Sequence, residues 1–231
     1  MEKINDVEII STARLDEKHL VESANVYCEA WLDIIRKDFN ALTDEQIKCI
    51  VTKQFRKRSE MFPDGQLSAY HTGLNRIIGN ISSLRVASDY KFMDWNLLTG
   101  QGYFVTHNPE GASIVCPAVN TSKEVSKYGI KGIAKQLVLA VRDVAINLKR
   151  GGLKKMFVFT RPSGYRNYIA KYGNASIEKY LETKVNGHPK EFPDPIDLHL
   201  GLGAKIIRAV ENARPADKDS LGYCVLMQYE I

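Results

Sequence analysis

The sequence of 231 residues lacks several features that define large classes of protein. It contains little cysteine. Its four cysteines are widely spaced and form no Cys-x-x-Cys pair: Cys28, Cys49, Cys116 and Cys224. A disulfide framework or a zinc site needs more ligands or closer ones, so we expect neither, and no metal. The simplest interpretation is a reduced, cytoplasmic protein whose cysteines in apolar runs are buried and inert.

Long apolar runs are also missing. No stretch of about 18 apolar residues occurs, so we expect no transmembrane helix and no membrane as a partner. Residues 1–6 carry acidic side chains and no apolar core, which is unlike a signal peptide, so we expect none.

A strong excess of charge of one sign is absent as well. The formal net charge is +5, and the one dense basic run contains Lys53, Arg56, Lys57 and Arg58. Because no aromatic residues accompany this run, we expect a solvated helix face and no nucleic acid as a partner. A modest positive charge fits an enzyme that handles phosphorylated cosubstrates or docks on an acidic partner.

The apolar residues that are present, 44% of the chain, follow helical and strand periodicities. They predict helices over about 16–38 and 44–61, a hairpin of strands 66–71 and 77–86, a strand at 112–119, a helix from 132 to about 149, a strand at 156–160, a mostly helical stretch at 165–183, and strands at 204–210 and 222–230. We interpret 87–102 as irregular and the proline-rich 189–195 as neither helix nor central strand. With no internal repeat or dividing linker, residues 1–231 are predicted to form a single α/β domain, a mixed central sheet flanked by helices with an N-terminal helical pair.

A glycine-bearing turn connects the predicted strand at 112–119 to the central helix. It reads Tyr128-Gly129-Ile130-Lys131-Gly132-Ile133-Ala134. A turn of this kind places unpaired backbone N–H groups, at the positive end of a helix dipole, in front of an anion such as a pyrophosphate. The alternative is an ordinary strand–helix turn, because turns with two glycines occur in many α/β proteins.

This turn resembles the acyl-CoA-binding turn of the GNAT acyltransferase superfamily, whose pattern is Arg/Gln-x-x-Gly-x-Gly/Ala. Gly132-Ile133-Ala134 matches the second half, whereas Gly129 stands where the Arg or Gln is usual, so a nearby lysine would supply that phosphate contact. The resemblance implies the GNAT fold, with coenzyme A in acyl form as cosubstrate. It places coenzyme A on Ala118, Val119, Lys127, Gly129, Ile130, Lys131, Gly132, Ile133, Ala134 and Lys135.

Further motifs resemble a narrower group, the GNAT-like loading domains of modular polyketide synthases of the curacin type. The matching elements, between about residues 65 and 229, are Trp95, His107-Asn108-Pro109-Glu110-Gly111, Thr160, Asp194-Pro195, His199 with Gly203-Ala204, and Arg214-Pro215-Ala216-Asp217. The resemblance implies an acyl-CoA donor, often malonyl-CoA that is decarboxylated. The acceptor that it implies is the phosphopantetheine thiol of an acyl carrier protein, in polyketide-type biosynthesis.

The same resemblance assigns roles to four residues. His199 and Thr160 hold and polarise the acyl thioester or its carboxylate, Trp95 walls the acyl pocket, and Arg214 lies near the substrate entrance. His199 also precedes Gly203 by four residues, in register with the tyrosine that protonates the CoA thiolate in simple GNAT enzymes. Because the pKa of an imidazole lies near neutrality, His199 is a candidate general acid or base. We expect Thr160 and His199 to face one another across a cleft.

Structural alternatives remain open for each of these residues. His199 would be a helix-end cap, Trp95 a core aromatic, Thr160 a β-branched strand end, and Arg214 a surface partner of Asp217 or Asp219. Two other functions also stay open: N-acylation of a small amine, and a non-catalytic acyl-CoA-binding module. The sequence leaves the acyl chain, the acceptor and the oligomeric state undetermined.

Overall fold

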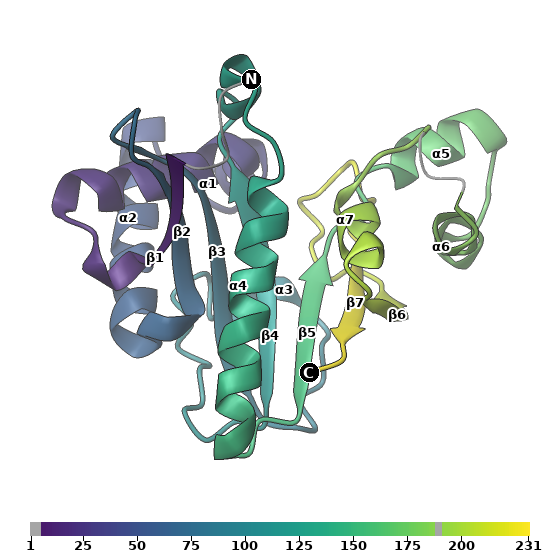
Figure 1. Ribbon diagram of the computed structural model, residues 1–231. Coiled ribbons are helices and arrows are strands. Elements are labelled where there is room, and N and C mark those ends of the chain that lie inside the picture. Colours follow the sequence, from purple (N-terminus) through teal and green to yellow (C-terminus); the bar gives the residue numbers. More distant parts are fainter. Residues whose placement is uncertain (1–5, 188–190) are drawn as a thin grey trace.

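A mixed sheet forms the centre of the molecule (Figure 1). The computed structural model describes residues 6–187 and 191–231 of the chain. The sheet has seven strands in the order β1-β2-β3-β4-β5-β7-β6. Only β4 and β5 pair in parallel, and every other neighbouring pair is antiparallel. The strands are β1 Val7–Ser11, β2 Gln66–His71, β3 Arg76–Val86, β4 Ser113–Thr121, β5 Lys155–Thr160, β6 Lys205–Val210 and β7 Cys224–Tyr229.

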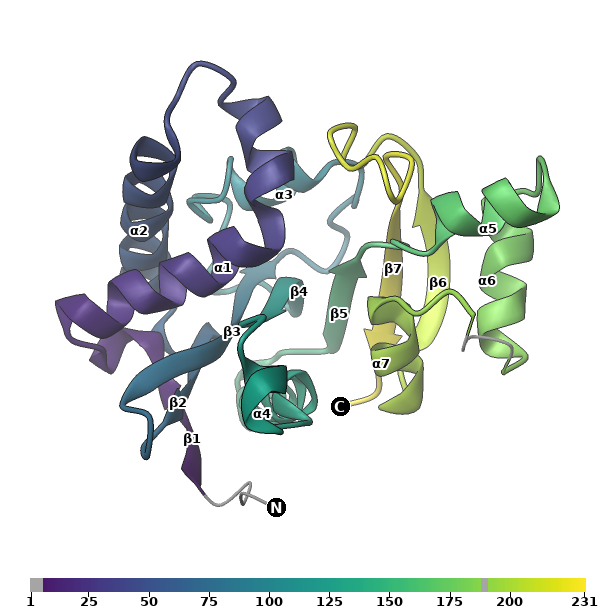
Figure 2. The same cartoon turned by 90° about the horizontal axis from the view of Figure 1, so that it is seen from above.

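Helices cover both faces of the sheet. They are α1 Glu17–Asp38, α2 Asp44–Met61, α3 Trp95–Thr99, α4 Ile133–Leu148, α5 Tyr165–Tyr172, α6 Ile177–Val185 and α7 Pro195–Gly201. Figure 2 shows α1, α2 and α3 on one face and α4 with α7 on the other, while α5 and α6 lie beyond β6 at one end. The predicted mixed sheet with an N-terminal helical pair is confirmed. No helix in the described part of the chain has both the length and the apolarity to cross a bilayer.

Local sequence signals explain where the flanking helices begin. The Asp16 side chain caps α1 by accepting a hydrogen bond from the backbone N–H of His19, and Thr43 with Gln46 forms a capping box at the start of α2. On α4 the buried side chains recur at helical spacing and face the sheet. They are Ile133, Leu137, Val138, Val141 and Ala145.

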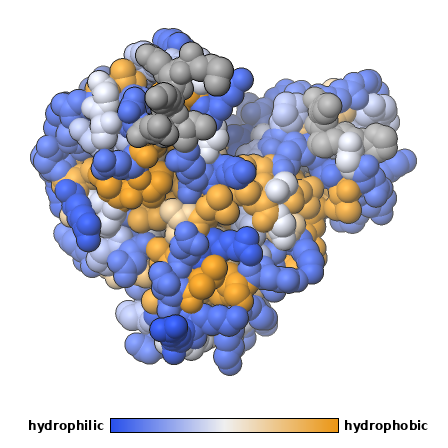
Figure 3. All heavy atoms as spheres, in the orientation of Figure 1, coloured by the Kyte–Doolittle hydropathy of each residue, from blue (hydrophilic) through white to orange (hydrophobic). Residues whose placement is uncertain are grey.

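The sheet splits at the end of the parallel pair. β4 and β5 pair only from Ser113 with Lys155 to Cys116 with Val158, although both strands continue beyond that point. Pro117 follows Cys116, and a proline has no backbone N–H to donate to a neighbouring strand. The register between β3 and β4 also shifts here, between Ser82 and Leu84. The two strands, β4 and β5, therefore diverge. Figure 3, in the orientation of Figure 1, shows the surface hollowed between the upper end of α4 and α5.

Three elements differ from the sequence prediction. Strand β1 at the sheet edge was not predicted, because its five residues are half-buried or exposed and show no strong alternation. Helix α3 lies in the stretch predicted to be irregular, where Asp94 caps it. Of the stretch 189–195, Pro189 and Lys190 lie outside the described residues, and residues 191–194 are neither helix nor strand. The prediction is wrong at Pro195, the first residue of α7, where a proline is well tolerated.

Candidate active site

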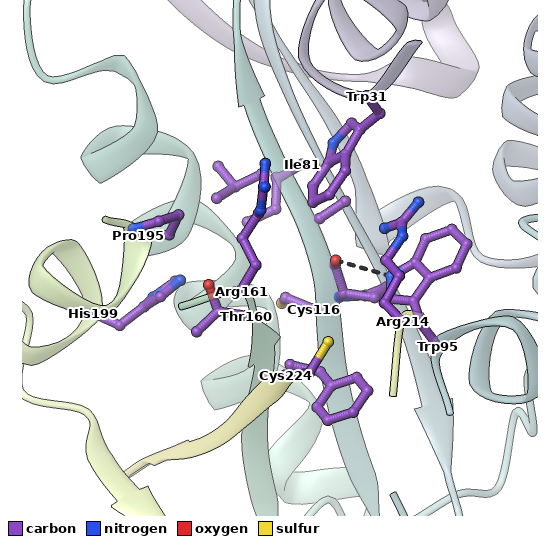
Figure 4. A pocket seen from close by; sticks show the side chains of 14 residues that line it. Trp31, Ile81, Trp95, Cys116, Thr160, Arg161, Pro195, His199, Arg214 and Cys224 are labelled. Atoms are coloured by element: carbon purple, nitrogen blue, oxygen red, sulfur yellow. Dashed lines mark hydrogen bonds between the residues drawn. The ribbon is translucent and has the colours of Figure 1, made fainter. Parts of the chain in front are cut away.

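A pocket opens where β4 and β5 part (Figure 4), and it is lined from both halves of the sheet and both helical layers. All four predicted catalytic residues line it, together with Ala118 and Val119 of the predicted CoA-binding set. The full lining is Trp31, Ile81, Trp95, Cys116, Pro117, Ala118, Val119, Phe159, Thr160, Arg161, Pro195, His199, Arg214 and Cys224. The roles of these residues stay predictions, but the structure brings the four into one site.

His199 lies in the last turn of α7 and is 2% exposed. Its Nδ1 lies 2.8 Å from the hydroxyl of Tyr229, so the ring is bound to a side chain rather than capping helix carbonyls. Burial lowers the pKa of the imidazole to about 4. The near-neutral pKa on which the expectation of a general acid or base rested is therefore wrong for this environment. At neutral pH His199 is an uncharged imidazole.

Thr160 is the last residue of β5 and remains paired with Val225 of β7. Its side chain is half-buried and faces the pocket that β4 vacates where the strands part. In Figure 4 the hydroxyl of Thr160 and the ring of His199 point toward one another. The pocket therefore holds a hydroxyl donor beside an imidazole, as the sequence led us to expect.

Arg214 is held between two tryptophans. Its guanidinium carbon lies 4.0 Å from the ring centroid of Trp95 and 4.3 Å from that of Trp31. The residue is 5% exposed, and its Nη1 is buried without a hydrogen-bond partner. Trp95 is fixed in turn, because its Nε1 donates to the carbonyl of Pro117 at 3.3 Å. Trp95 is thus both a core aromatic and part of the pocket wall.

The surface ion pair considered for Arg214 does not form. Asp217 and Asp219 pair with Arg161 instead, at 2.6 and 3.4 Å, and no ion pair in residues 6–187 and 191–231 involves Arg214. Asp38 lines a neighbouring cavity with Arg214 but makes no ion pair with it, and burial raises the pKa of that carboxyl. The positive charge of Arg214 is therefore buried without a bound counter-charge, which is costly unless an anion occupies the pocket.

The turn before α4 has the shape of an anion cradle. Gly129 and Gly132 have φ values of 68° and 79°, and a Cβ at either position would meet open space. No side chain caps α4, and the first N–H groups of any helix lack intrahelical partners. Lys127, Lys131 and Lys135 are exposed around the turn, whereas the predicted Ile130 and Ile133 are buried and offer only their backbone. This geometry fits the phosphates of coenzyme A.

No acidic side chain is among the described residues that line the pocket, whereas two arginines are. The two cysteines there are poor nucleophiles, because burial raises the pKa of both thiols, that of Cys224 to about 12. Residues 6–187 and 191–231 contain no group of three or more potential metal ligands. The site offers neutral hydrogen-bond donors and cations, and no base strong enough to deprotonate an ammonium.

Sequence reasoning missed three residues of this site. Trp31, whose Nε1 donates to Asn120 at 2.5 Å, and Tyr229 occupy apolar positions that periodicity assigns to the core. Arg161 had a weak signal, since it directly follows a buried strand. Pro117 inside a strand was a further signal, because proline in a central strand marks a bulge or the end of pairing.

Comparison with known proteins gives two relatives by sequence, and no family model matches the chain. “Probable hydrolase YhcX” of Bacillus subtilis (strain 168) is 30% identical over 207 residues, which are 85% of this chain but 37% of that protein. “Uncharacterized N-acetyltransferase YkwB” of the same bacterium is 28% identical over 180 residues, 77% of this chain and 73% of that protein. The chain thus spans little more than a third of YhcX.

Solved structures give a fuller match. The loading GNATL domain of CurA from Lyngbya majuscula superposes with a TM-score of 0.70 at 17% identity, covering 97% of both chains. The GphF GNAT-like decarboxylase, solved with isobutyryl-CoA, gives 0.65 at 21% identity, covering 96% of this chain and 98% of that one. At these identities the likeness concerns the fold. The chain has the fold of the GNAT acyltransferases.

Proposed function

We propose that this protein moves an acyl group from coenzyme A to the phosphopantetheine thiol of an acyl carrier protein in polyketide-type biosynthesis. One observation carries the proposal: the unpaired, buried guanidinium of Arg214 shares a pocket with Thr160 and His199, and no carboxylate lines that pocket. Such a pocket suits an anionic acyl donor and an acceptor that needs no strong base. The acyl group is acetyl, formed from malonyl-CoA by decarboxylation.

Coenzyme A would bind along the split between β4 and β5. Its pyrophosphate would occupy the backbone N–H groups at Gly132 to Lys135, with exposed Lys127 and Lys131 adding positive charge. Its pantetheine arm would follow Ala118 and Val119, where β4 still pairs with β3 but no longer with β5. Two proteins of this fold were solved with such ligands, GphF with isobutyryl-CoA and an aminoglycoside 6'-N-acetyltransferase with coenzyme A at a TM-score of 0.52, which supports coenzyme A as the ligand.

In the first chemical step the bond between the malonyl carboxylate and its methylene carbon breaks. Carbon dioxide leaves, and the electron pair of that bond moves into the thioester as an enolate, whose carbon then takes a proton from solvent water to give acetyl-CoA. The hydroxyl of Thr160 and the imidazole of His199 would donate hydrogen bonds to the developing oxyanion. Arg214 would hold the carboxylate before it leaves, which supplies its missing counter-charge.

In the second step the carrier thiolate attacks the acetyl carbonyl carbon. The carbon–sulfur bond to coenzyme A breaks, and the departing CoA thiolate takes up the proton released by the carrier thiol. The same two donors would stabilise the oxyanion of the tetrahedral intermediate, since it forms at the same carbonyl oxygen. A thiol ionises near pH 8.5, so this acceptor makes little demand on a base in the protein.

N-acylation of a small amine is the main alternative, and the name of YkwB and the fold shared with the aminoglycoside enzyme favour it. An amine reaches the site as an ammonium that must lose a proton. The two arginines of the pocket repel a cation, and His199, with its pKa of about 4, is a weak base. The pocket therefore favours the thiol acceptor over the amine.

An acceptor panel with one donor tests the proposal. Malonyl-CoA or acetyl-CoA is offered with phosphopantetheinylated carrier protein, with a primary amine, or with buffer alone, and release of free CoA is followed. We expect release that depends on the carrier. Release with the amine alone would favour N-acylation, release into buffer would indicate thioester hydrolysis, and tight binding without any release would favour a non-catalytic module.

A further inference from the structure

A hydrogen bond joins a histidine of the pocket wall to a buried tyrosine behind it. The hydroxyl of Tyr229 on β7 lies 2.8 Å from Nδ1 of His199 on α7, and the two rings meet edge to face with centroids 6.0 Å apart. Tyr229 is 1% exposed and His199 is 2% exposed. Water therefore cannot replace either partner, and the direction of this bond is fixed by what the protein itself supplies.

Counting donors and acceptors gives that direction. A neutral imidazole has one N–H and one bare nitrogen, and a phenol has one O–H. If Nδ1 carried the proton, the O–H of Tyr229 would need a second acceptor, and the described residues offer it no other hydrogen bond. If the phenol donates to Nδ1, the hydroxyl and Nδ1 are both satisfied by one bond, and the remaining N–H, on Nε2, is left for the pocket that His199 lines. The second arrangement avoids an orphaned buried donor.

We propose that Tyr229 is a positioning residue that donates its phenolic proton to Nδ1 of His199 and so fixes the imidazole as the neutral Nε2–H tautomer. The remaining ring N–H then faces the pocket that Thr160 shares, as the orientation of the ring in Figure 4 allows. His199 acts as a hydrogen-bond donor to an oxyanion. This role rests on the proposed function, but the tautomer itself does not.

The charged and titratable groups around the pair support this assignment. Arg142 of α4 and Cys116 of β4 adjoin Tyr229, and Arg161, Arg214 and Cys224 line the pocket with His199. None of them is a carboxylate, and the acidic residues of α7 itself, Asp194 and Asp197, are paired with Lys184 of α6. Burial lowers the pKa of His199 and raises that of Tyr229, which keeps both partners neutral between about pH 5 and pH 9.

Nitrogen-15 NMR of histidine-labelled protein reads the tautomer directly. In the folded wild-type chain we expect Nδ1 of His199 to give the signal of an unprotonated nitrogen and Nε2 that of a protonated one, unchanged from pH 5 to pH 9. An assignment with the proton on Nδ1, or a ring that titrates near pH 6.5, would overturn the proposal. This measurement needs no variant and no substrate.

Tyr229→Phe tests the positioning role. Removing the donor should allow the Nδ1–H tautomer to appear in the spectrum and lower kcat about tenfold, with KM for acyl-CoA nearly unchanged, because one hydrogen bond is lost behind the ring. Tyr70→Phe is the matched control, since its hydroxyl bonds Asn75 in the β2–β3 hairpin, away from the pocket. An unchanged tautomer in Tyr229→Phe would defeat the proposal.

The two proposals fail separately. An inert enzyme whose His199 shows the Nε2–H tautomer would contradict the acyl transfer and keep the role of Tyr229 in setting the ring. An active enzyme with the Nδ1–H tautomer would contradict the proposed role of Tyr229 and would leave the proposed acyl transfer intact.

Discussion

The guanidinium of Arg214 is the least compensated charge in the pocket. Stacking between Trp31 and Trp95 stabilises it, because cation–π contacts are worth about 2 kcal/mol when desolvated. Stacking does not satisfy the buried Nη1, which has no partner. A ligand carboxylate would satisfy it. We therefore expect Arg214 to favour acyl-CoA donors that carry a carboxylate over those that lack one.

Arg214→Met keeps an unbranched, flexible side chain, though a shorter one, and removes the charge. We expect kcat/KM for malonyl-CoA to fall about 10- to 100-fold, the equivalent of a charged hydrogen bond, and that for acetyl-CoA to change little. Steady-state kinetics with both donors measure the ratio. The exposed Arg166 serves as control through Arg166→Met. Equal losses with both donors would mean that Arg214 does not bind the carboxylate.

The buried imidazole of His199 should make the free energy of unfolding depend on pH. Its pKa is lowered from 6.5 to about 4 in the folded state, so the unfolded chain takes up a proton at a higher pH than the folded one. The contribution of His199 is complete above about pH 6.5 and is lost as the pH falls toward 4, by about 3 kcal/mol in all. Denaturant unfolding at several pH values should show this loss in the wild type. His199→Gln should lack it, and parallel curves for the two proteins would contradict the burial of a neutral ring.

Among the elements, the turn before α4 is proposed to hold the phosphates, and the last turn of α7 carries His199. The turn offers its backbone because both glycines occupy the left-handed region with open space outside. An anion can approach such a turn closely, and it meets the positive end of α4 there.

Gly132→Val should weaken acyl-CoA binding at least about tenfold, because a branched side chain would stand where the phosphates approach. Gly152→Val is a matched control: its φ of 91° is also left-handed and its surroundings are equally open, but it follows α4 at the opposite end. Both variants carry similar backbone strain, so their stabilities should fall alike. Calorimetric titration with acyl-CoA separates them. Equal affinities would place the phosphates elsewhere.

α7 is anchored to α6 by a buried lysine. Nζ of Lys184 lies 3.6 Å from Asp194 and 2.9 Å from Asp197, and its side chain is 1% exposed. Lys184→Met should lower the free energy of unfolding by about 3–5 kcal/mol, because it leaves two acidic groups without their cation. The exposed pair of Lys205 and Glu230 is the reference, and Lys205→Met should change stability by less than about 1 kcal/mol. Similar losses in denaturant unfolding would contradict the anchoring.

The order of the elements could be predicted from the sequence, because amphipathic periodicity reports which face of each element is buried. Short elements such as β1 and α3 could not, since they contain too few residues to show a period. His199, Thr160, Trp95 and Arg214 were found through their order along the chain. Tyr229 and Trp31 were not found. Their spacing along the chain predicts that the rings are buried, but it does not predict which group binds the hydroxyl or the indole N–H.

The environment of each site residue could not be predicted from the sequence either. The pKa of His199 follows from the packing of α7 against β7, and the pairing of Asp217 with Arg161 rather than Arg214 follows from how β5 and the loop before β7 meet. Both depend on contacts between segments far apart in the sequence. Spacing along the chain does not report such contacts.

For the whole molecule, the split sheet unites these features. The diverging ends of β4 and β5 open the pocket that Thr160 and His199 line, and Arg214 lies on the tryptophan-lined side of the same pocket. That residues 1–231 act as a single domain stays a prediction. We infer that this one opening receives an acyl-CoA and passes the acyl group to a carrier thiol.

The most direct test is the intact mass of a phosphopantetheinylated carrier protein after incubation with the enzyme and malonyl-CoA. Our account predicts a carrier that gains an acetyl group, with carbon dioxide released in equal amount. It also predicts that Thr160→Val impairs this reaction more than transfer from preformed acetyl-CoA, because malonyl-CoA needs the hydroxyl in both steps and acetyl-CoA needs it only in the transfer. A carrier that stays unmodified while a small amine becomes acylated would contradict the account.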